Sequence, residues 1–376
     1  MNGFFSKMPR LPFHIVKREN CPLWMKCCFY LAAIVIALLA GALVLWAIDV
    51  DPWDYYYQMF TMGAVGNKRA YKIYMNYIKE FLPLALTSVA LSLAFKMKFW
   101  NIGGEGQFIM GAVSAAFVAF KLGPVAPAWV TLIVMCITAM VIAGIYGLIA
   151  GILKVRFGTN ETLMTLMLNY IALYFLTFIG ETKADWNFFL QEKSARPVFE
   201  SFKDIVIFPS IPLGEKFELN VCFILTLMVG AIIFVYLKYT KQGYEISVVG
   251  DSPNTAHYAG MKVNRIVLRT VFLSASLVGL AAAFKVGSSG VLSTSITDDV
   301  GWTGIIVAWL AQLNTGMIFI VSALICVLQF GSVNAASEFA RVDSSFANML
   351  QGLILFLVLA ADFFIRFRIA RTKKGE

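Results

Sequence analysis

The chain has 376 residues, of which 59% are apolar and 14% are charged. Soluble domains carry roughly a quarter charged residues, so this composition excludes a soluble globular protein and indicates one that crosses a membrane several times. The net charge of +9 does not indicate a nucleic-acid partner, because Lys and Arg gather at the ends of apolar segments, where they orient membrane helices. The first partner that we expect is the lipid bilayer.

About ten apolar segments approach the roughly 20 residues that a helix needs to cross a bilayer. In chain order they are 28–48, 81–97, 102–120, 126–153, 161–180, 219–237, 266–284, 301–313, 315–333 and 348–365. The eighth is short, and 126–153 is long enough to tilt or to extend beyond the bilayer. We predict an all-α polytopic membrane protein with one transmembrane domain over 28–367, between a basic N-terminal segment (1–27) and a basic tail (368–376).

The distribution of basic residues favours an orientation with both termini in the cytoplasm. With the N-terminus inside, ten spans return the C-terminus to the same side, and most of the 31 basic residues then lie in cytoplasmic segments. The two long loops, 49–80 and 181–218, then lie outside and collect acidic residues. The charge asymmetry is modest but supports this orientation.

Residues 101–107, Asn-Ile-Gly-Gly-Glu-Gly-Gln, interrupt the apolar sequence where the second and third segments meet. Irregular backbone at membrane depth occurs where it is buried in protein or lines a cavity. An ionisable residue inside a membrane segment indicates a functional site, and interrupted hydrophobic segments in transporters indicate the substrate path. We therefore assign to a substrate path Asn101, Gly103, Gly104, Glu105 and Gln107.

Each polar side chain in this stretch also has a structural interpretation. Glu105 either hydrogen-bonds solute hydroxyls, anchors an interrupted helix in a polar network, or pairs with Lys96 or Lys98 at the membrane edge. Asn101 and Gln107 either bind hydroxyls or a base edge, or cap helices.

Polar residues also lie on roughly one face of the fifth segment, at Thr162, Thr165, Asn169 and Thr177. Such a stripe faces the interior of a helix bundle rather than lipid, where it either lines a path or hydrogen-bonds a neighbouring helix. We add Thr165 and Asn169 to the predicted path.

Residues 86–96 and 273–285 are similar in sequence. Each segment is followed by a glycine-containing interruption, 101–107 after the first and 301–304 (Gly-Trp-Thr-Gly) after the second. Five spans in each half would invert the second half relative to the first, with the path at the interface of the two repeats. Chance similarity between two Ala/Leu/Ser-rich helices is the alternative. Trp302 then mirrors the first interruption, and it either stacks on a base or sugar or serves as an aromatic at the membrane interface.

The polar segment 239–265 has the signals of a short helix at the cytoplasmic surface. Asp251 or Ser252 is a candidate N-cap, with Pro253 at the first helical position and Gly260 as a left-handed end. The helix carries two small residues, Ala256 and Ala259, and we expect it to insert into a groove on a partner protein. The alternative is a solvated loop that only joins two spans.

At this point a family resemblance becomes specific. Residues 250–261, Gly-Asp-Ser-Pro-Asn-Thr-Ala-His-Tyr-Ala-Gly-Met, resemble the coupling loop of binding-protein-dependent ABC transporter permeases, in particular the ribose and simple-sugar branch and its nucleoside-uptake-like group. Residues 101–107, 160–172, 301–308 and 350–355 are similar to motifs of the same branch, in the same order. Two positions depart from the family pattern: Ser247 replaces a frequent arginine, and Thr255 replaces the first of two paired alanines.

The resemblance implies a permease subunit of an importer in the plasma membrane that moves a nucleoside or a simple sugar inward. It also implies a second homologous permease subunit, an extracellular solute-binding lipoprotein, and a cytoplasmic ATP-binding subunit that contacts the loop 239–265. We assign to that last contact Glu245, Gly250, Asp251, Ala256, Tyr258, Ala259 and Gly260. The sequence contains no phosphate-binding Gly-x-x-x-x-Gly-Lys-Ser/Thr loop, so we expect no enzyme activity and no cofactor in this chain, with ATP and Mg²⁺ on the partner.

Two other functions are less consistent with the sequence. A stand-alone ion-coupled secondary transporter needs a carboxylate or histidine relay near the middle of the membrane, for which Glu105 and Glu161 give little support. A membrane enzyme needs a catalytic or metal-binding pattern, but the two histidines, His14 and His257, belong to none.

Overall fold

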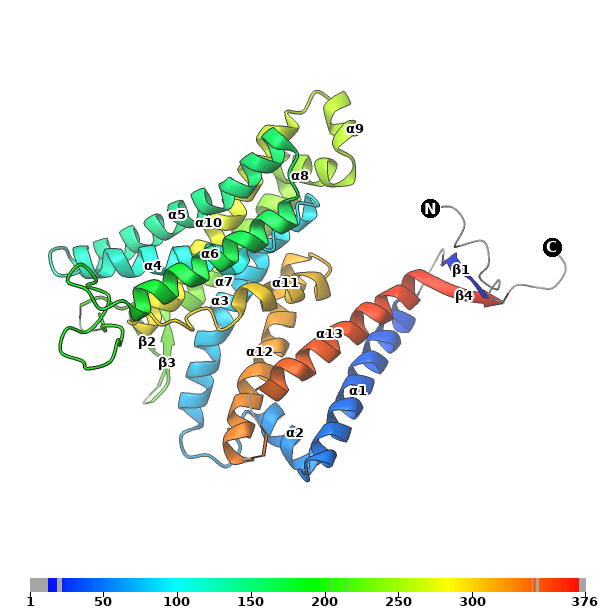
Figure 1. Cartoon of the computed structure of the whole chain (residues 1–376). Coiled ribbons are helices and arrows are strands. Elements are labelled where there is room, and N and C mark those ends of the chain that lie inside the picture. Colours follow the sequence, from blue (N-terminus) through cyan, green and yellow to red (C-terminus); the bar gives the residue numbers. More distant parts are fainter. Residues whose placement is uncertain are drawn as a thin grey trace. The chain divides into compact units, whose positions relative to one another are not determined.

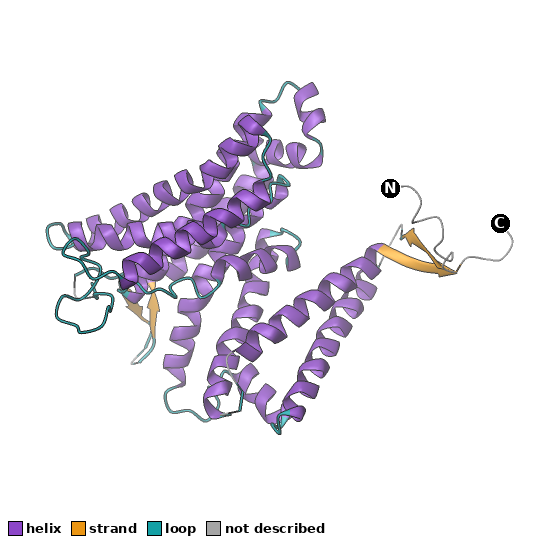
Figure 2. Cartoon of the chain, in the orientation of Figure 1, coloured by secondary structure: helices purple, strands orange, loops and turns teal. Residues whose placement is uncertain are grey.

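The computed structural model describes residues 13–18, 22–203, 205–214, 216–339, 341–342 and 345–371, and within them helices predominate (Figures 1 and 2). The helices are α1 (Leu23–Ala47), α2 (Pro52–Thr61), α3 (Ala70–Lys96), α4 (Gly104–Leu122), α5 (Ala128–Phe157), α6 (Glu161–Glu181), α7 (Val221–Tyr239), α8 (Lys241–Asp251), α9 (Pro253–Tyr258), α10 (Val263–Ser289), α11 (Val300–Leu310), α12 (Thr315–Glu338) and α13 (Ser345–Arg366). The strands are β1 (Phe13–Lys17), β2 (Ser210–Pro212), β3 (Glu218–Asn220) and β4 (Phe367–Arg371).

The predicted set of apolar helices is confirmed in the described part of the chain. Nine helices there are long and apolar enough to cross a membrane, and the shorter apolar helix α11 corresponds to the eighth predicted segment. The largest difference is in the second segment, which begins at Ala70 rather than at 81, because amphipathic turns precede the apolar run. The protein is thus an all-α polytopic membrane protein.

The chain folds into two compact units, 59–331 and the pair of end segments 1–58 and 332–376. In the larger unit, α3 and α10 are the most deeply buried of the long helices and pack against each other, where the Ser274 hydroxyl donates to the Ala90 carbonyl at 2.7 Å. Gly279 brings α10 so close to α5 that a Cβ there would lie 2.2 Å from the Ala139 carbonyl oxygen. Small residues therefore allow these membrane helices to approach closely.

In the smaller unit, α1 and α13 lie side by side, and β1 pairs with β4 as an antiparallel ladder from Phe13 opposite Arg371 to Lys17 opposite Phe367 (Figure 1). These strands were not predicted from the sequence; they lie in or beside the two segments assigned as basic ends. Residues 1–12, 19–21 and 372–376 of those ends lie outside the described residues.

The loop between α6 and α7 is folded rather than extended. Buried Asn187 donates to the carbonyls of Ile179 and Thr182, each at 2.7 Å, and the hairpin of β2 and β3 leads into α7. The Phe202 and Phe208 amides donate to the carbonyls of Gly290 and Gly287, which joins this loop to the end of α10.

Candidate functional site

The interrupted stretch 101–107 is a buried loop followed by the first turn of α4, which begins at Gly104. Asn101 and Gln107 are buried, and their side-chain amides bond each other twice, at 3.0 and 3.2 Å. The Gly103 amide also donates to Asn101 Oδ1 at 3.0 Å. The two amide side chains thus close the turn before α4, whose N-cap residue is Gly103 and has no side-chain cap hydrogen bond.

Two residues from α6 complete this turn. The Gly106 amide donates to Asn169 Oδ1 at 2.8 Å, and Asn169 Nδ2 donates to the Ile102 carbonyl at 2.8 Å. The Ile102 amide donates to the Thr165 hydroxyl oxygen at 3.2 Å. A Cβ at Gly106 would lie 3.0 Å from Asn169, so glycine permits this close approach. The two buried residues of the polar stripe on α6, Thr165 and Asn169, therefore hold the start of α4 in place. The other two, Thr162 and Thr177, lie at partly exposed positions.

Glu105 joins the start of α4 to the start of α11. Its Oε2 accepts the Gly301 amide at 2.9 Å, and Thr297 and the Trp302 backbone also hydrogen-bond this carboxyl group. The first amides of a helix have no partner within the helix and favour a negative charge. Glu105 therefore anchors the interrupted region in a polar network, and among the described ion pairs none joins it to Lys96 or Lys98.

The two helix starts meet through glycine. The Cβ that Gly104 lacks would be 3.5 Å from the Gly301 Cα, and a Cβ at Gly301 would lie 2.3 Å from the Glu105 amide nitrogen. Trp302, next in α11, keeps 39% of its surface exposed. Of the eight predicted path residues, seven thus lie in or against the start of α4, and Trp302 is the one with a substantial exposed surface.

The polar segment between α7 and α10 forms two short helices. Ser252 accepts the Thr255 amide as N-cap of α9, Pro253 is its first residue, and Gly260 has φ +75°, as predicted; of the two N-cap candidates, Ser252 takes the role. The preceding helix α8 was not predicted, because its buried residues Ile246, Val249 and Gly250 form only a narrow apolar stripe on a polar helix. Thr240 caps α8 by accepting the Gly243 amide at 3.2 Å.

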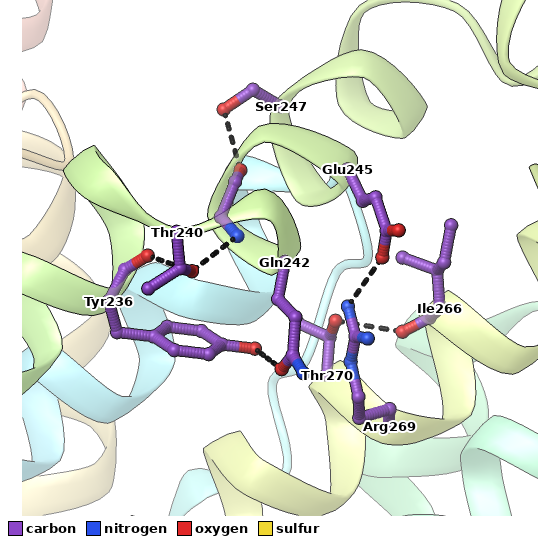
Figure 3. Close-up of polar contacts among 9 residues, drawn as sticks. Tyr236, Thr240, Gln242, Glu245, Ser247, Ile266, Arg269 and Thr270 are labelled. Atoms are coloured by element: carbon purple, nitrogen blue, oxygen red, sulfur yellow. Dashed lines mark hydrogen bonds and ion pairs between the residues drawn. The ribbon is translucent and has the colours of Figure 1, made fainter.

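Figure 3 shows how α8 is fixed to α7 and α10. The Glu245 carboxylate of α8 pairs with Arg269 of α10 at 3.1 Å, and both side chains are largely buried. The Tyr236 hydroxyl of α7 donates to Gln242 Oε1 at 3.0 Å. Glu245 therefore fixes α8 to α10 within this chain. Any effect of Glu245 on a partner contact would come from the position that it gives to α8.

The other predicted coupling residues divide into inward and outward sets. A Cβ at Gly250 would lie 2.1 Å from the Lys96 carbonyl oxygen, so α8 packs directly on the last turn of α3. Ala256 is fully buried in a cluster with Met97 and Phe99, which differs from the expectation that it lies on the surface of α9, because α9 turns this side toward the core. The exposed residues are Asp251, Tyr258, Ala259 and Gly260, and Tyr258 is 94% exposed.

Comparison with known proteins defines the family. A family model described as "Branched-chain amino acid transport system / permease component" matches residues 73–359. The chain belongs to this permease family. It is 28% identical over 348 residues to the guanosine ABC transporter permease protein NupP of Bacillus subtilis, covering 92% of this chain and 96% of that protein.

Other relatives cover the chain as fully. The nucleoside ABC transporter permease protein NupB of Lactococcus lactis is 27% identical, with 91% of this chain and 93% of that protein covered. The glucose ABC transporter permease protein TsgB13 of Haloferax volcanii is 26% identical, with 96% and 94% covered. The family and these relatives do not favour a stand-alone ion-coupled transporter.

Several residues that organise this permease were not predicted from the sequence. Arg269 and Thr297 have no motif around them, and their partners Glu245 and Glu105 are distant in the chain. Lys285 was not predicted either. It pairs with Glu80 at 2.9 Å and with Asp298 at 2.5 Å, and these residues come together only in the folded protein. One sequence feature pointed to Lys285: it corresponds to Lys96 in the two similar segments 86–96 and 273–285.

Proposed function

We propose that this permease forms one half of the membrane pore of an ABC importer that moves a nucleoside or a simple sugar inward across the plasma membrane. A second homologous permease subunit forms the other half, an extracellular solute-binding lipoprotein delivers the solute, and both termini of this chain are cytoplasmic. The relatives support the solute class, since their names specify guanosine, nucleosides and glucose. The observation that carries the proposal is the exposed helix α9, which is attached through α8 and the buried Ala256 to the ends of α3 and α10.

The attachment of α9 gives a physical route from a cytoplasmic ATPase to the solute path. A partner that binds Tyr258 and Ala259 pushes on α8, which rests directly on the α3 backbone through Gly250 and on α10 through Glu245. In the core, α3 packs against α11 and α10 packs against α4, and Leu91 of α3 lies beside Gly104 at the start of α4. ATP and Mg²⁺ bound to the partner then favour one of two arrangements of the path.

The path runs beside the meeting point of α4 and α11. Asn101, Gln107, Thr165 and Asn169 form its wall by holding the loop, and Glu105 fixes the start of α11. Trp302 contributes the aromatic surface for a base or a sugar ring, because its indole is exposed next to these starts. Gly103, Gly104 and Gly301 allow the backbone of the two helix starts to pack closely, because a side chain at any of them would meet a neighbouring group.

The coupling function is tested by Tyr258→Glu, with Tyr74→Glu as the matched control. Both tyrosines are exposed, but Tyr74 lies at the opposite end of α3 from the residues that contact α8. We expect Tyr258→Glu to release the ATPase during co-purification and to abolish solute-stimulated ATP hydrolysis, while Tyr74→Glu retains both. Normal stimulated hydrolysis with Tyr258→Glu would contradict the assignment of α9.

The solute class is tested by uptake into vesicles that contain the complete transporter. Guanosine, ribose, glucose and leucine are offered separately, with ATP inside the vesicles. We expect uptake of the nucleoside or of one sugar and none of leucine. ATP-dependent uptake of leucine alone would overturn the solute assignment while retaining the importer.

A further inference from the structure

Three membrane helices of the larger unit end or begin around one cavity. α3 ends at Lys96, α7 ends at Tyr239 and α12 begins at Thr315. The importer function proposed above gives this cavity no role. Its volume is about 400 Å³, and the described residues that line it include Lys96, Phe234, Leu237, Lys238, Gln312 and Asn314.

The cavity has two cations and no carboxylate among its described lining residues. Lys96 and Lys238 each lie in the last turn of their helix, where the helix dipole favours a cation. The dipole explains one lysine at each helix end, but it does not explain why both meet at one cavity. None of the described ion pairs contains either lysine, and the first carboxylate after α7, that of Glu245, is paired with Arg269. Because two like charges beside one cavity repel each other, the lysines indicate an anionic ligand.

The loop between α11 and α12 adds neutral groups that suit an anion. Asn314 caps α12 by accepting the Gly316 amide at 3.0 Å, and the NH2 group of the same side chain is a donor. The first amides of α12 also give this end of the cavity a positive partial charge. Gln312 and Leu313 have φ +50° and +58°, a conformation that non-glycine residues rarely adopt. Residues strained in this way gather at binding sites.

Aromatic residues place the cavity at the edge of the bilayer. Trp100, in the loop that follows α3, is 46% exposed and stacks on Trp309 with the ring centres 5.3 Å apart. Tyr239, next to Lys238 at the end of α7, is 69% exposed. Tryptophan and tyrosine beside lysine at the ends of membrane helices mark the membrane–water interface. The cavity therefore lies at the depth of the lipid headgroups.

An exposed apolar surface continues from the cavity along α7. Phe234 lines the cavity and is exposed, and Val235 and Ile232 on the same helix are exposed too. Most residues in the apolar part of α7 are not buried in protein. A small soluble anion would leave this surface uncovered, whereas the acyl chains of a lipid would contact it.

We propose that this cavity binds the headgroup of an anionic phospholipid, whose acyl chains lie along α7. The phosphate accepts hydrogen bonds from the ammonium groups of Lys96 and Lys238 and from the Asn314 amide. Basic pockets between membrane helices are typical sites for such headgroups. The preferred lipid carries a net negative charge, because the ammonium of phosphatidylethanolamine would be repelled by the two lysines.

The experiment counts the lipids bound to the complete transporter by native mass spectrometry. The protein is purified in detergent and mixed with equal amounts of phosphatidylglycerol and phosphatidylethanolamine. We compare the wild type with Lys96→Gln/Lys238→Gln and with Lys238→Gln alone, whose side chain is exposed, so that folding is retained. The matched control is Lys68→Gln/Lys72→Gln, which removes the same charge from exposed positions next to the opposite end of α3.

We expect the wild type to prefer phosphatidylglycerol. Each lysine that is removed lowers its binding about fivefold, since one basic residue at an anionic surface contributes roughly this factor. The control retains the preference, and so does Lys238→Arg, because a guanidinium group also binds phosphate. Inorganic phosphate at the same concentration leaves the lipid bound, because it lacks the chains that contact Phe234 and the rest of α7.

The proposal is wrong if the wild type shows no preference, if both lysine variants retain it, or if the control loses it equally. Displacement of the lipid by an equal concentration of inorganic phosphate would assign the cavity to a free anion instead. Loss of the ATPase or of a second permease subunit from Lys96→Gln/Lys238→Gln, with the lipid preference unchanged, would assign these lysines to a protein contact.

Discussion

Individual side chains in the core of this permease serve backbone groups that the helices leave unpaired. Asn169 accepts one amide and donates to one carbonyl of the loop before α4, and Glu105 accepts an amide at the start of α11. These groups are buried, so the polar side chains that pair with them hold the starts of α4 and α11 in place.

Asn169→Leu tests this role. The substitution keeps the approximate size but removes both partners of the Gly106 amide and the Ile102 carbonyl. Each unpaired buried group costs about 1–3 kcal/mol, so we expect a clear fall in the detergent unfolding temperature. The control is Thr177→Val on the same helix, because the Thr177 hydroxyl donates to the Leu173 carbonyl of its own helix and the residue is partly exposed. Equal stability of both variants would contradict the capping role.

Glu105→Gln and Glu105→Leu separate charge from hydrogen bonding. Gln keeps one oxygen that accepts the Gly301 amide, but it loses the charge that favours a helix start, worth about 0.3–1 kcal/mol, and replaces the second acceptor oxygen by an NH2 group. Leu also leaves the amide unpaired, which adds about 1–3 kcal/mol. We expect the unfolding temperatures to fall in the order wild type, Gln, Leu, and uptake to change in the Gln variant while the ATPase remains bound. Unaltered uptake kinetics with Gln would remove Glu105 from the solute path.

At the scale of helices, close approaches decide which elements move together. α8 carries polar residues yet packs on α3 because Gly250 has no Cβ, and α9 follows it with Ala256 in the same cluster. The short surface helix was predictable, since Ser252, Pro253 and Gly260 are local cap signals. Its attachment was not, because nothing in 239–265 identifies the Lys96 carbonyl as its neighbour.

Gly250→Ala tests the contact between α8 and α3. The added Cβ would meet a backbone oxygen at 2.1 Å, and backbone cannot rotate away as a side chain can. We expect the ATPase to bind more weakly and stimulated hydrolysis to fall at least about tenfold, which corresponds to roughly 1.4 kcal/mol. The control is Gly352→Ala in α13, where an added Cβ meets nothing within 4 Å. Wild-type coupling in Gly250→Ala would show that α8 and α3 need not touch.

At the scale of the whole molecule, a few bonds join segments far apart in the chain. Lys285, with its side chain 9% exposed, holds Glu80 of α3 and Asp298 of the segment before α11. Ser201 and Val291 form a bridge between the loop 182–220 and the same segment. This segment leads to Trp302 and hydrogen-bonds Glu105 through Thr297, and it is therefore tied to two other parts of the larger unit.

Lys285→Met tests the importance of this connection. The substitution fills much of the space but leaves two partly solvated carboxylates without their cation, at a cost of about 1–2 kcal/mol. We expect faster amide hydrogen exchange in residues 290–299 and slower uptake. Lys121→Met is the control, because Lys121 contacts the Phe188 ring, an interaction worth about 0.5–1 kcal/mol. Unchanged exchange in 290–299 would contradict the proposed role of Lys285.

The sequence by itself determined the membrane class, the apolar helices and the caps of α9, because hydrophobic length and cap residues act over a few neighbouring positions. It also supplied the motifs of the family to which the chain belongs. The inverted repeat, the orientation and the solute path remain predictions. Only the tertiary structure decided the partners of Glu105, Glu245 and Lys285, the inward position of Ala256 and the pairing of β1 with β4. Each of these contacts joins positions far apart in the chain, and local patterns carry no information about which distant backbone or side-chain group will be within hydrogen-bonding distance.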